Sequence, residues 1–219
     1  MSDAPVIGVD WYKAGWVAVV LSDEPRVLVG ADLKELIEGA ACVGVDMPIG
    51  LPETTRDADK AARDFVGVRR NSVFMTPPAE VLDAASYEEA NVIAAALLGG
   101  KKISRQAWAL RHNIAAVATV AAGDERVIEV HPEVSFCAMR GGEHLAYAKT
   151  TWNGQALRRA ALATHGIVLP DHLVEAGGVP PADVLDAAAA AWTARRHARG
   201  VSESLPAGWE RGRPGAIWY

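Results

Sequence analysis

The chain has 219 residues, of which 50% are hydrophobic and 22% are charged, a composition that excludes global disorder and allows a sizeable core. Its formal net charge of −5 argues against indiscriminate binding to polyanions but leaves room for a local basic patch. The length fits one large domain or two small ones.

The sequence shows no signal for export or for insertion into a membrane. No secretory signal precedes the first apolar stretch, and no apolar run is long enough to span a bilayer. The two cysteines, Cys42 and Cys137, match neither a metal-binding nor a redox spacing. We therefore expect a soluble, cytoplasmic protein that does not act at a membrane.

The N-terminal region predicts strands and one helix. Residues 6–10 and 16–21 are apolar and predict two strands, which the turn at Gly15 joins as an antiparallel hairpin. A third strand is predicted at 26–30. A helix at 32–39 and a strand at 41–46 follow. This order of elements predicts a mixed sheet of the α/β class.

Residues 53–123 have a mainly helical pattern. A capping box that starts at Ser86 opens one helix, and residues 103–117 carry apolar side chains in alternating steps of four and three. Residues 69–78 are irregular. Because no linker composition marks either end of this section, we expect a helical insertion that packs on the sheet.

The C-terminal region begins with a strand predicted at 126–130, and Pro132 suits the first position of the next helix. Further helices are predicted at 155–165 and from 182 to about 197. The tail, about 200–219, contains glycine, proline and aromatic residues, which suggest that it docks on the body of the protein.

Three acidic residues stand at the ends of apolar strands: Asp10, Asp46 and Glu129. In an open α/β sheet, ligands bind outside the carboxyl ends of the strands, so each acid would project towards one rim. Each of them taken alone could simply cap a turn or the next helix. Three together favour a site, because close carboxylates repel one another unless a cation holds them.

The last predicted helix adds two more acids. Asp186 has Ala182, Asp183, Ala189 and Ala190 at the positions of an intrahelical partner, so any cation that pairs with it lies elsewhere. Asp183 lies in the first turn, where a carboxylate complements the helix dipole. Asp186 is therefore the stronger candidate of the two.

Carboxylates without cysteine and with few histidines favour a hard cation, so the expected cofactor is Mg²⁺ or Mn²⁺ and not zinc. Two such ions about 4 Å apart can hold a phosphodiester, activate a water and stabilise the leaving oxygen. The expected ligands are Asp10, Asp46, Asp186 and Glu129, with Asp183 beside them.

This arrangement resembles the RNase H-like fold. More narrowly, it resembles a family of uncharacterised proteins, of the domain-of-unknown-function type, that are regarded as RNase H-like nucleases. The resemblance covers the chain from residue 6 to about 195, and its pieces are specific only as a set. They are Gly8-Val9-Asp10 with Gly15-Trp16, residues 46–52 (DMPIGLP), Ser72-Val73-Phe74 with Pro77, residues 129–136 (EVHPEVSF), Lys149-Thr150 with Gly154, and residues 183–187 (DVLDA).

The resemblance implies a single α/β domain over residues 1–219. Its five-stranded mixed sheet would have three antiparallel, hairpin-linked strands followed by two parallel strands, with flanking helices. It also implies acids on the first strand, the fourth strand and the C-terminal helix, which here are Asp10, Asp46 and Asp186. The implied activity is metal-dependent hydrolysis of nucleic acid or another phosphodiester. From its place at a strand end, we expect Glu129 to assist the three aspartates.

Other residues are weighed for the same site. Glu133 falls inside a matching piece and is a second-rank metal ligand, although a glutamate in a first helical turn commonly complements the helix dipole. His131 could position a water or phosphate, or it could merely cap the helix opened by Pro132. Most surface lysines and arginines make no specific contact, and tryptophan often closes the edge of a core. The substrate-binding candidates are Trp11, Arg69, Arg70, His131 and Lys149.

Two further hypotheses stand beside the nuclease. The first is a nucleotide-using phosphotransferase or ATPase, because actin-like ATPases share this strand topology. Against it, residues 11–15 are poor in the small residues that a loop needs to surround a phosphate. A non-catalytic binding protein would keep the fold and show no stabilisation by metal. The sequence leaves open DNA or RNA, endo- or exonuclease action, and whether the protein is a homo-oligomer.

Overall fold

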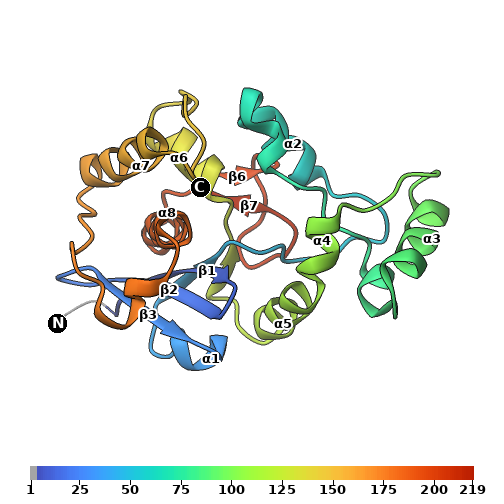
Figure 1. Ribbon diagram of the computed structural model, residues 1–219, viewed down its shortest axis with the longest axis horizontal. Helices are drawn as coiled ribbons and strands as arrows, with labels where there is room; N and C mark the ends of the chain where they lie inside the picture. The colour runs from blue at the N-terminus through green and yellow to red at the C-terminus, as the bar shows by residue number, and fades with distance from the viewer. Residues whose placement is uncertain (1–3) are drawn as a thin grey trace.

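A five-stranded sheet forms the centre of the computed structural model, which describes residues 4–219 (Figure 1). β1 pairs antiparallel with β2, and β2 with β3, whereas β4 lies parallel to β1 and β5 parallel to β4. The expected mixed α/β sheet is confirmed. In spatial order its strands are β3 (Arg26–Gly30), β2 (Gly15–Leu21), β1 (Val6–Tyr12), β4 (Cys42–Val45) and β5 (Val127–Glu129).

Short turns join the three antiparallel strands, and helices fill the connections from β3 to β4 and from β4 to β5 and most of the chain after β5. Ser86 caps one of them as predicted, because its hydroxyl accepts a hydrogen bond of 3.1 Å from the Glu89 backbone nitrogen. Among residues 4–219, no helix is both long enough and apolar enough to cross a bilayer. The α-helices are α1 (Leu33–Leu36), α2 (Asp57–Phe65), α3 (Tyr87–Leu97), α4 (Arg105–Ala109), α5 (Arg111–Ala122), α6 (Pro132–Met139), α7 (Trp152–Thr164) and α8 (Pro181–Ala198), and the 3₁₀ helices are η1 (Gly67–Ser72), η2 (Ala79–Asp83) and η3 (Val174–Gly178).

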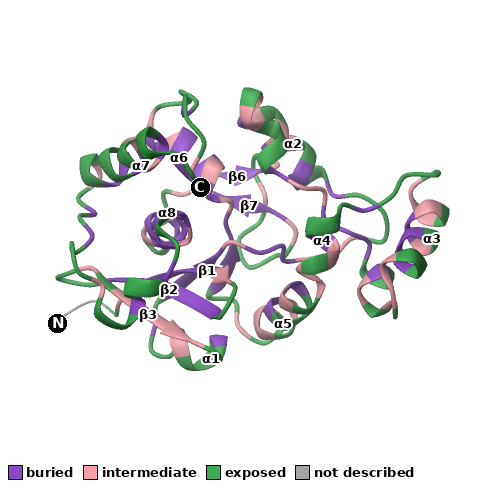
Figure 2. Cartoon of the chain, viewed as in Figure 1, coloured by how far each residue is buried: buried purple, intermediate pink, exposed green. Residues whose placement is uncertain are grey.

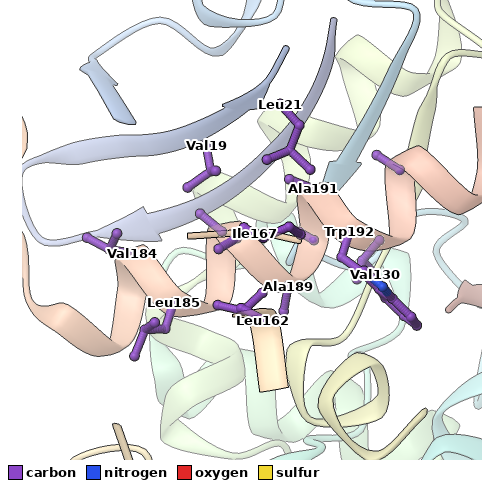
Figure 3. Close-up of a cluster of buried hydrophobic side chains, with 14 of the residues drawn as sticks. Val19, Leu21, Val130, Leu162, Ile167, Val184, Leu185, Ala189, Ala191 and Trp192 are labelled. Atoms are coloured by element: carbon purple, nitrogen blue, oxygen red, sulfur yellow. The ribbon is translucent and has the colours of Figure 1, made fainter. Parts of the chain in front are cut away.

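Apolar side chains cover both faces of the sheet. On one face, strand residues such as Val19 and Leu21 pack with Leu162 of α7 and Trp192 of α8 (Figure 3). On the other face, strand residues pack with α1 and with Ile114 of α5. Burial on both faces explains why the sequences of β1 and β2 are almost continuously apolar.

The helix α8 is enclosed along most of its length, since residues 184–194 are all buried. Figure 1 shows it end-on between the sheet and the pair α6 and α7, and it contacts all of these. Figure 2 shows buried residues around its whole circumference. An acidic side chain in the middle of this helix is therefore withdrawn from bulk solvent.

Glycine residues on two strands allow α8 to lie directly on the sheet. A Cβ atom on Gly8 would lie 2.0 Å from the Ala191 nitrogen and 2.1 Å from the Ala187 carbonyl oxygen. A Cβ atom on Gly44 would lie 2.5 Å from the Ala190 carbonyl oxygen. Gly8 and Gly44 are partners in the parallel register of β1 and β4. Side by side and without side chains, they let the backbone of the helix approach the sheet closely.

The section predicted as a helical insertion divides into parts with different partners. α5 packs on the sheet through Ile114 and Val117, as expected. α3 instead packs on η2 and α4, in a small cluster around Val81 and Ala94, and Figure 1 shows it far from the sheet. The prediction that the whole section packs on the sheet is therefore wrong for α3.

The helix predicted through residues 103–117 is two helices. α4 ends at Ala109, Leu110 serves as the cap of both helices, and α5 begins at Arg111. The apolar spacing continues across this break, so the pattern in the sequence did not indicate it. At the break, Leu110 is partly buried: it packs against the same core as Ile114 and also lines a pocket.

The C-terminal tail docks on the body of the protein. β6 (Ser204–Leu205) pairs antiparallel with β7 (Ile217–Trp218), and Trp218 forms a parallel bridge with Val130, just beyond β5. The buried ring of Trp218 also meets His197 of α8 edge-on, with 4.5 Å between the ring centroids. These contacts agree with the docking that the aromatic residues predicted.

Candidate metal centre

Three acids converge beside the N-terminal half of α8. Asp10 lies on β1, Asp46 directly follows β4, and Asp186 lies in the second turn of α8. Each offers a carboxylate oxygen, and these oxygens all lie within 4.8 Å of one another. We call these three residues the acidic triad.

The strand pattern explains the convergence. Alternate residues of a strand face the same side, so in Gly8-Val9-Asp10 and Gly44-Val45-Asp46 each aspartate follows its glycine on the α8 face. The Asp46 nitrogen also donates a hydrogen bond of 2.9 Å to the Val9 carbonyl oxygen, which continues the pairing of β4 with β1. The glycines thus admit α8, and the aspartates meet its Asp186.

The acidic triad is withdrawn from water. Asp10 is 7% exposed and Asp186 3%, and Asp46 is half-buried. Burial, with a contribution from the charge of Asp186, raises the pKa of Asp46 to about 8. Burial and the Asp46 carboxylate raise the pKa of Asp10, and burial raises that of Asp186 against the opposing effect of Lys149.

Lys149 provides a cation next to the acidic triad. Its ammonium group lies 2.5 Å from Asp186 Oδ2. Burial acts to lower the pKa of Lys149, but the carboxylates of Asp186, Asp46 and Asp10 together outweigh it and raise that pKa above its ordinary value. The Lys149 side chain is 42% exposed and comes from the loop between α6 and α7. One ammonium group therefore faces three carboxyl groups whose pKa values burial raises, so a further cation would be needed for all three to ionise together.

The acidic triad lies in a pocket of about 690 Å³, which we call the acidic pocket. Most of the residues predicted for the site line it. Arg70 is exposed and is not among the lining residues in the described part of the chain. The predicted residues that line the pocket are Asp10, Trp11, Asp46, Arg69, His131, Glu133, Lys149, Asp183 and Asp186.

Glu129 does not join the acidic triad. Its register partner on β4 is Val45 and not Asp46, so its side chain faces the side of the sheet opposite α8. There it is 5% exposed and held by Arg56, whose Nη1 and Nη2 lie 2.6 and 2.7 Å from its oxygens, and by the Ile49 nitrogen at 2.6 Å. Arg56 also bonds Asp59, so Glu129 belongs to a buried ionic cluster beneath the pocket wall.

Glu129→Gln is expected to lower the free energy of unfolding by about 1–3 kcal/mol, because a buried charge-assisted bond to Arg56 is weakened. It is expected to leave metal binding by the acidic triad nearly unchanged. Urea unfolding and calorimetric titration with Mn²⁺ measure the two effects. A loss of Mn²⁺ binding with full stability would instead support the original prediction that Glu129 is a ligand.

The remaining predicted ligands lie at the edge of the site. Glu133 forms an ion pair with Arg158, which is completely buried in α7 and also donates to the Gly154 carbonyl oxygen at 3.0 Å. Asp183 lines the acidic pocket one helical turn before Asp186 but has no oxygen in the group of three. The structure therefore separates a central set of three candidate ligands from two peripheral acids.

His131 lies in the pocket wall. Its Nε2 is 3.3 Å from the Ser72 carbonyl oxygen, which fits a donor on that nitrogen. Burial of the ring lowers the pKa of His131, which favours the neutral form. Its Nδ1 is buried and has no hydrogen-bond partner among residues 4–219. The neutral ring therefore presents an unused acceptor near the acidic triad.

Sequence reasoning missed several residues of the site. Arg56 was not considered, although its position three residues before Asp59 matches the spacing of an intrahelical ion pair. Phe74 lay inside a matching piece but received no function. Asn71 and Gln106 also line the acidic pocket, and as ordinary polar residues they gave no signal at all.

The raised pKa of Asp46 predicts a dependence of stability on pH. Between the ordinary value of 3.8 and about 8, the folded protein keeps a proton that the unfolded chain has lost, so the free energy of unfolding falls as pH rises through this range. Asp46→Asn removes this contribution, and the variant is expected to lose less stability over that range than the unmodified protein. Melting temperatures in chelator at several pH values measure this, and two parallel curves would contradict it.

The acidic triad fits a hard divalent ion. Its donors are all carboxylate oxygens, the ligands that Mg²⁺ and Mn²⁺ prefer. Around one octahedral Mg²⁺ with Mg–O distances of about 2.1 Å, neighbouring oxygen atoms lie about 3 Å apart and opposite ones about 4 Å apart. The oxygens of the acidic triad, within 4.8 Å of one another, would need only small side-chain rotations to share an ion.

Comparison with protein-family models gives a match over residues 8–211 to a family described as Protein of unknown function (DUF429). A search of curated proteins and a search of solved structures each give no match. The matched range contains the acidic triad and every residue that lines the acidic pocket.

Proposed function

The chain belongs to the DUF429 family, and we propose from its site that it is a divalent-metal-dependent phosphodiesterase that hydrolyses nucleic acid. One observation carries the proposal: Asp10, Asp46 and Asp186 come from three separate elements and meet within 4.8 Å in a pocket. Burying three carboxylates together is costly without a cation, so the arrangement is best explained by metal binding.

The topology supports an RNase H-like assignment. Three antiparallel strands are followed by two parallel ones, and the acids stand on the first strand, after the fourth strand and on the C-terminal helix. This is the order of strands and acids that the resemblance in the sequence implied. The Mg²⁺ or Mn²⁺ preference follows from the all-oxygen donor set.

A bound divalent ion supplies Lewis acidity at the phosphoryl oxygens and favours ionisation of water. The chain's own residues then have distinct tasks. Asp10, Asp46 and Asp186 hold the ion and fix its place relative to the substrate. Lys149 orients Asp186 through its 2.5 Å bond and keeps part of the local charge balanced. Glu129 contributes indirectly, because it accepts a hydrogen bond from the Ile49 nitrogen while Arg56 donates to the Ile49 carbonyl oxygen, and together they hold the loop after Asp46.

The proposal is tested with the purified full-length chain and bis(para-nitrophenyl) phosphate, together with DNA and RNA substrates. Hydrolysis is expected in Mn²⁺ or Mg²⁺ and none in chelator. Calorimetry with Mn²⁺ is expected to show binding, and the melting temperature is expected to rise with added metal.

Three results would contradict the proposal. Metal binding without hydrolysis of any diester would leave a metal-binding protein without this activity. The absence of both metal binding and stabilisation would favour the non-catalytic hypothesis. Tight, metal-dependent binding of ATP with release of inorganic phosphate would favour the ATPase instead.

A further inference from the structure

The acidic triad lies at the bottom of the acidic pocket and not on an open face. Asp10 and Asp186 are almost fully buried, whereas Val68 on the wall is 80% exposed and Gln106 and Ala109 are also exposed. The walls come from η1, from the break between α4 and α5, and from the loop that carries Lys149. A substrate must therefore send its reacting phosphate below this rim.

This depth distinguishes single strands from duplexes. A duplex is a rigid cylinder, and its stacked, paired nucleotides cannot enter a pocket of about 690 Å³ without unpairing. A single strand can splay one nucleotide inward at little cost. The volume lies in the usual range for a site that encloses a small molecule, about 300–1,000 Å³.

The lining of the acidic pocket suits a nucleotide base. Trp11 and Phe74 are aromatic residues of the lining, and Met47 and Leu110 are apolar ones. All four also pack with the core on the face of the sheet opposite α8, so they form an apolar side of the pocket that is anchored in that core. Trp11 is held edge-on by Trp16, with ring centroids 5.0 Å apart, so its ring is already fixed before a ligand binds. Aromatic side chains in such sites stack on bases with about 1–3 kcal/mol per base.

Arg69 provides a place for a neighbouring phosphate. Its Nε donates a hydrogen bond of 2.9 Å to the Leu145 carbonyl oxygen, which fixes the guanidinium group in the pocket wall. Its Nη2 is buried and has no hydrogen-bond partner among residues 4–219. A buried donor without a partner is costly, and a phosphate oxygen would satisfy it with a charge-assisted bond.

From these observations we infer that the acidic pocket takes an unpaired nucleotide of a single-stranded nucleic acid. Its base packs on the aromatic lining, its scissile phosphate faces the acidic triad, and an adjacent phosphate binds Arg69. This inference rests on the proposed function for the scissile step, but strand binding itself can be measured separately.

The test compares four ligands of the same sequence: single-stranded DNA, single-stranded RNA, blunt duplex DNA and blunt RNA–DNA hybrid. Binding is measured by fluorescence anisotropy with Ca²⁺ in place of Mn²⁺, and cleavage is measured with Mn²⁺. At least one single strand is expected to bind about tenfold or more tightly than its duplexes. The tighter of the two single strands identifies the sugar. Equal binding of single strands and blunt duplexes would overturn the inference.

Arg69 and Arg70 form a matched pair of variants, because they are neighbours on η1 and only Arg69 lines the acidic pocket. Arg69→Ala is expected to weaken single-strand binding about tenfold, and Arg70→Ala less than about twofold. Arg69→Lys keeps the positive charge but removes the guanidinium group, so it tests whether binding needs that group and not only its charge. Equal losses for the two alanine variants would indicate general attraction to the backbone and would contradict the pocket.

The outcomes separate this inference from the proposed function. If single strands bind with the stated preference but neither they nor bis(para-nitrophenyl) phosphate are hydrolysed, the inference on the ligand holds and the phosphodiesterase fails. If bis(para-nitrophenyl) phosphate is hydrolysed with Mn²⁺ but single strands bind no more tightly than duplexes, the phosphodiesterase holds and the inference on the ligand fails.

Discussion

Gly8→Ala is expected to destabilise the protein severely and to abolish metal binding at the same time. The added methyl group would lie 2.0 Å from the Ala191 nitrogen and 2.1 Å from the Ala187 carbonyl oxygen, so the backbone of α8 would have to retreat by more than about 1 Å. Because α8 packs on β1, β2 and β4 and carries Asp186, the retreat would open the main core and separate the acidic triad.

The expected loss in the free energy of unfolding is at least about 4 kcal/mol, in the range reserved for major disruptions of a core. For a protein of this size, that corresponds to a fall in melting temperature of about 10 °C or more. Differential scanning calorimetry measures it, and Mn²⁺ titration of the folded variant at low temperature reports the loss of the site.

Gly177→Ala is the matched control. Gly177 lies in η3 with no atom within 4 Å of an added Cβ, so the same substitution should change the melting temperature only slightly. If Gly8→Ala were as mild as Gly177→Ala, the close approach of α8 to the sheet would be incorrect.

Asp10→Asn is expected to lower the rate of metal-dependent cleavage by about a thousandfold or more while the fold stays intact. The side chain keeps its shape, and its oxygen can still accept the 2.7 Å hydrogen bond from the Trp11 nitrogen. The substitution removes one of three ligand charges, and metal ions contribute several kcal/mol to stabilising such transition states.

In chelator, Asp10→Asn should be at least as stable as the unmodified protein at pH 8. Burial and the Asp46 carboxylate raise the pKa of Asp10, so its ionisation is unfavourable in the folded state, and an amide avoids that cost. The expected combination is therefore a gain in stability without metal and a loss of stabilisation by Mn²⁺.

Asp183→Asn is the comparison in the same pocket. Asp183 lines the acidic pocket but contributes no oxygen to the acidic triad, so the same change should reduce the rate by less than about tenfold. A rate for Asp10→Asn that equals that of Asp183→Asn would remove the acidic triad as the catalytic metal site.

Local pattern in the sequence was sufficient for most elements. The hairpin of β1 and β2 and the strand β4 appeared as apolar segments, because burial on both faces of a sheet demands apolar residues throughout. The edge strand β3 is only partly buried, yet its apolar residues were sufficient to indicate it. The cap at Ser86 was recognisable, because capping depends on neighbours in the sequence. The break at Leu110 was not, because both helices keep the same apolar spacing.

For the site, too, some features follow from the sequence alone and others only from the tertiary structure. The sequence by itself determined that Asp10 and Asp46 follow Gly8 and Gly44 on equivalent faces of two strands, and that Asp186 has no partner within its own helix. These facts depend only on the two-residue repeat of strands and the turn of a helix.

Only the tertiary structure decided which acids meet. Glu129 also ends an apolar strand, but register pairs it with Val45, and so it points to the opposite face and bonds Arg56. A shift of one residue in register reverses the face of every side chain, and such a shift is set by long-range pairing that no local pattern contains. The walls of the acidic pocket, which join segments from Trp11 to Lys149, depend on the same long-range contacts.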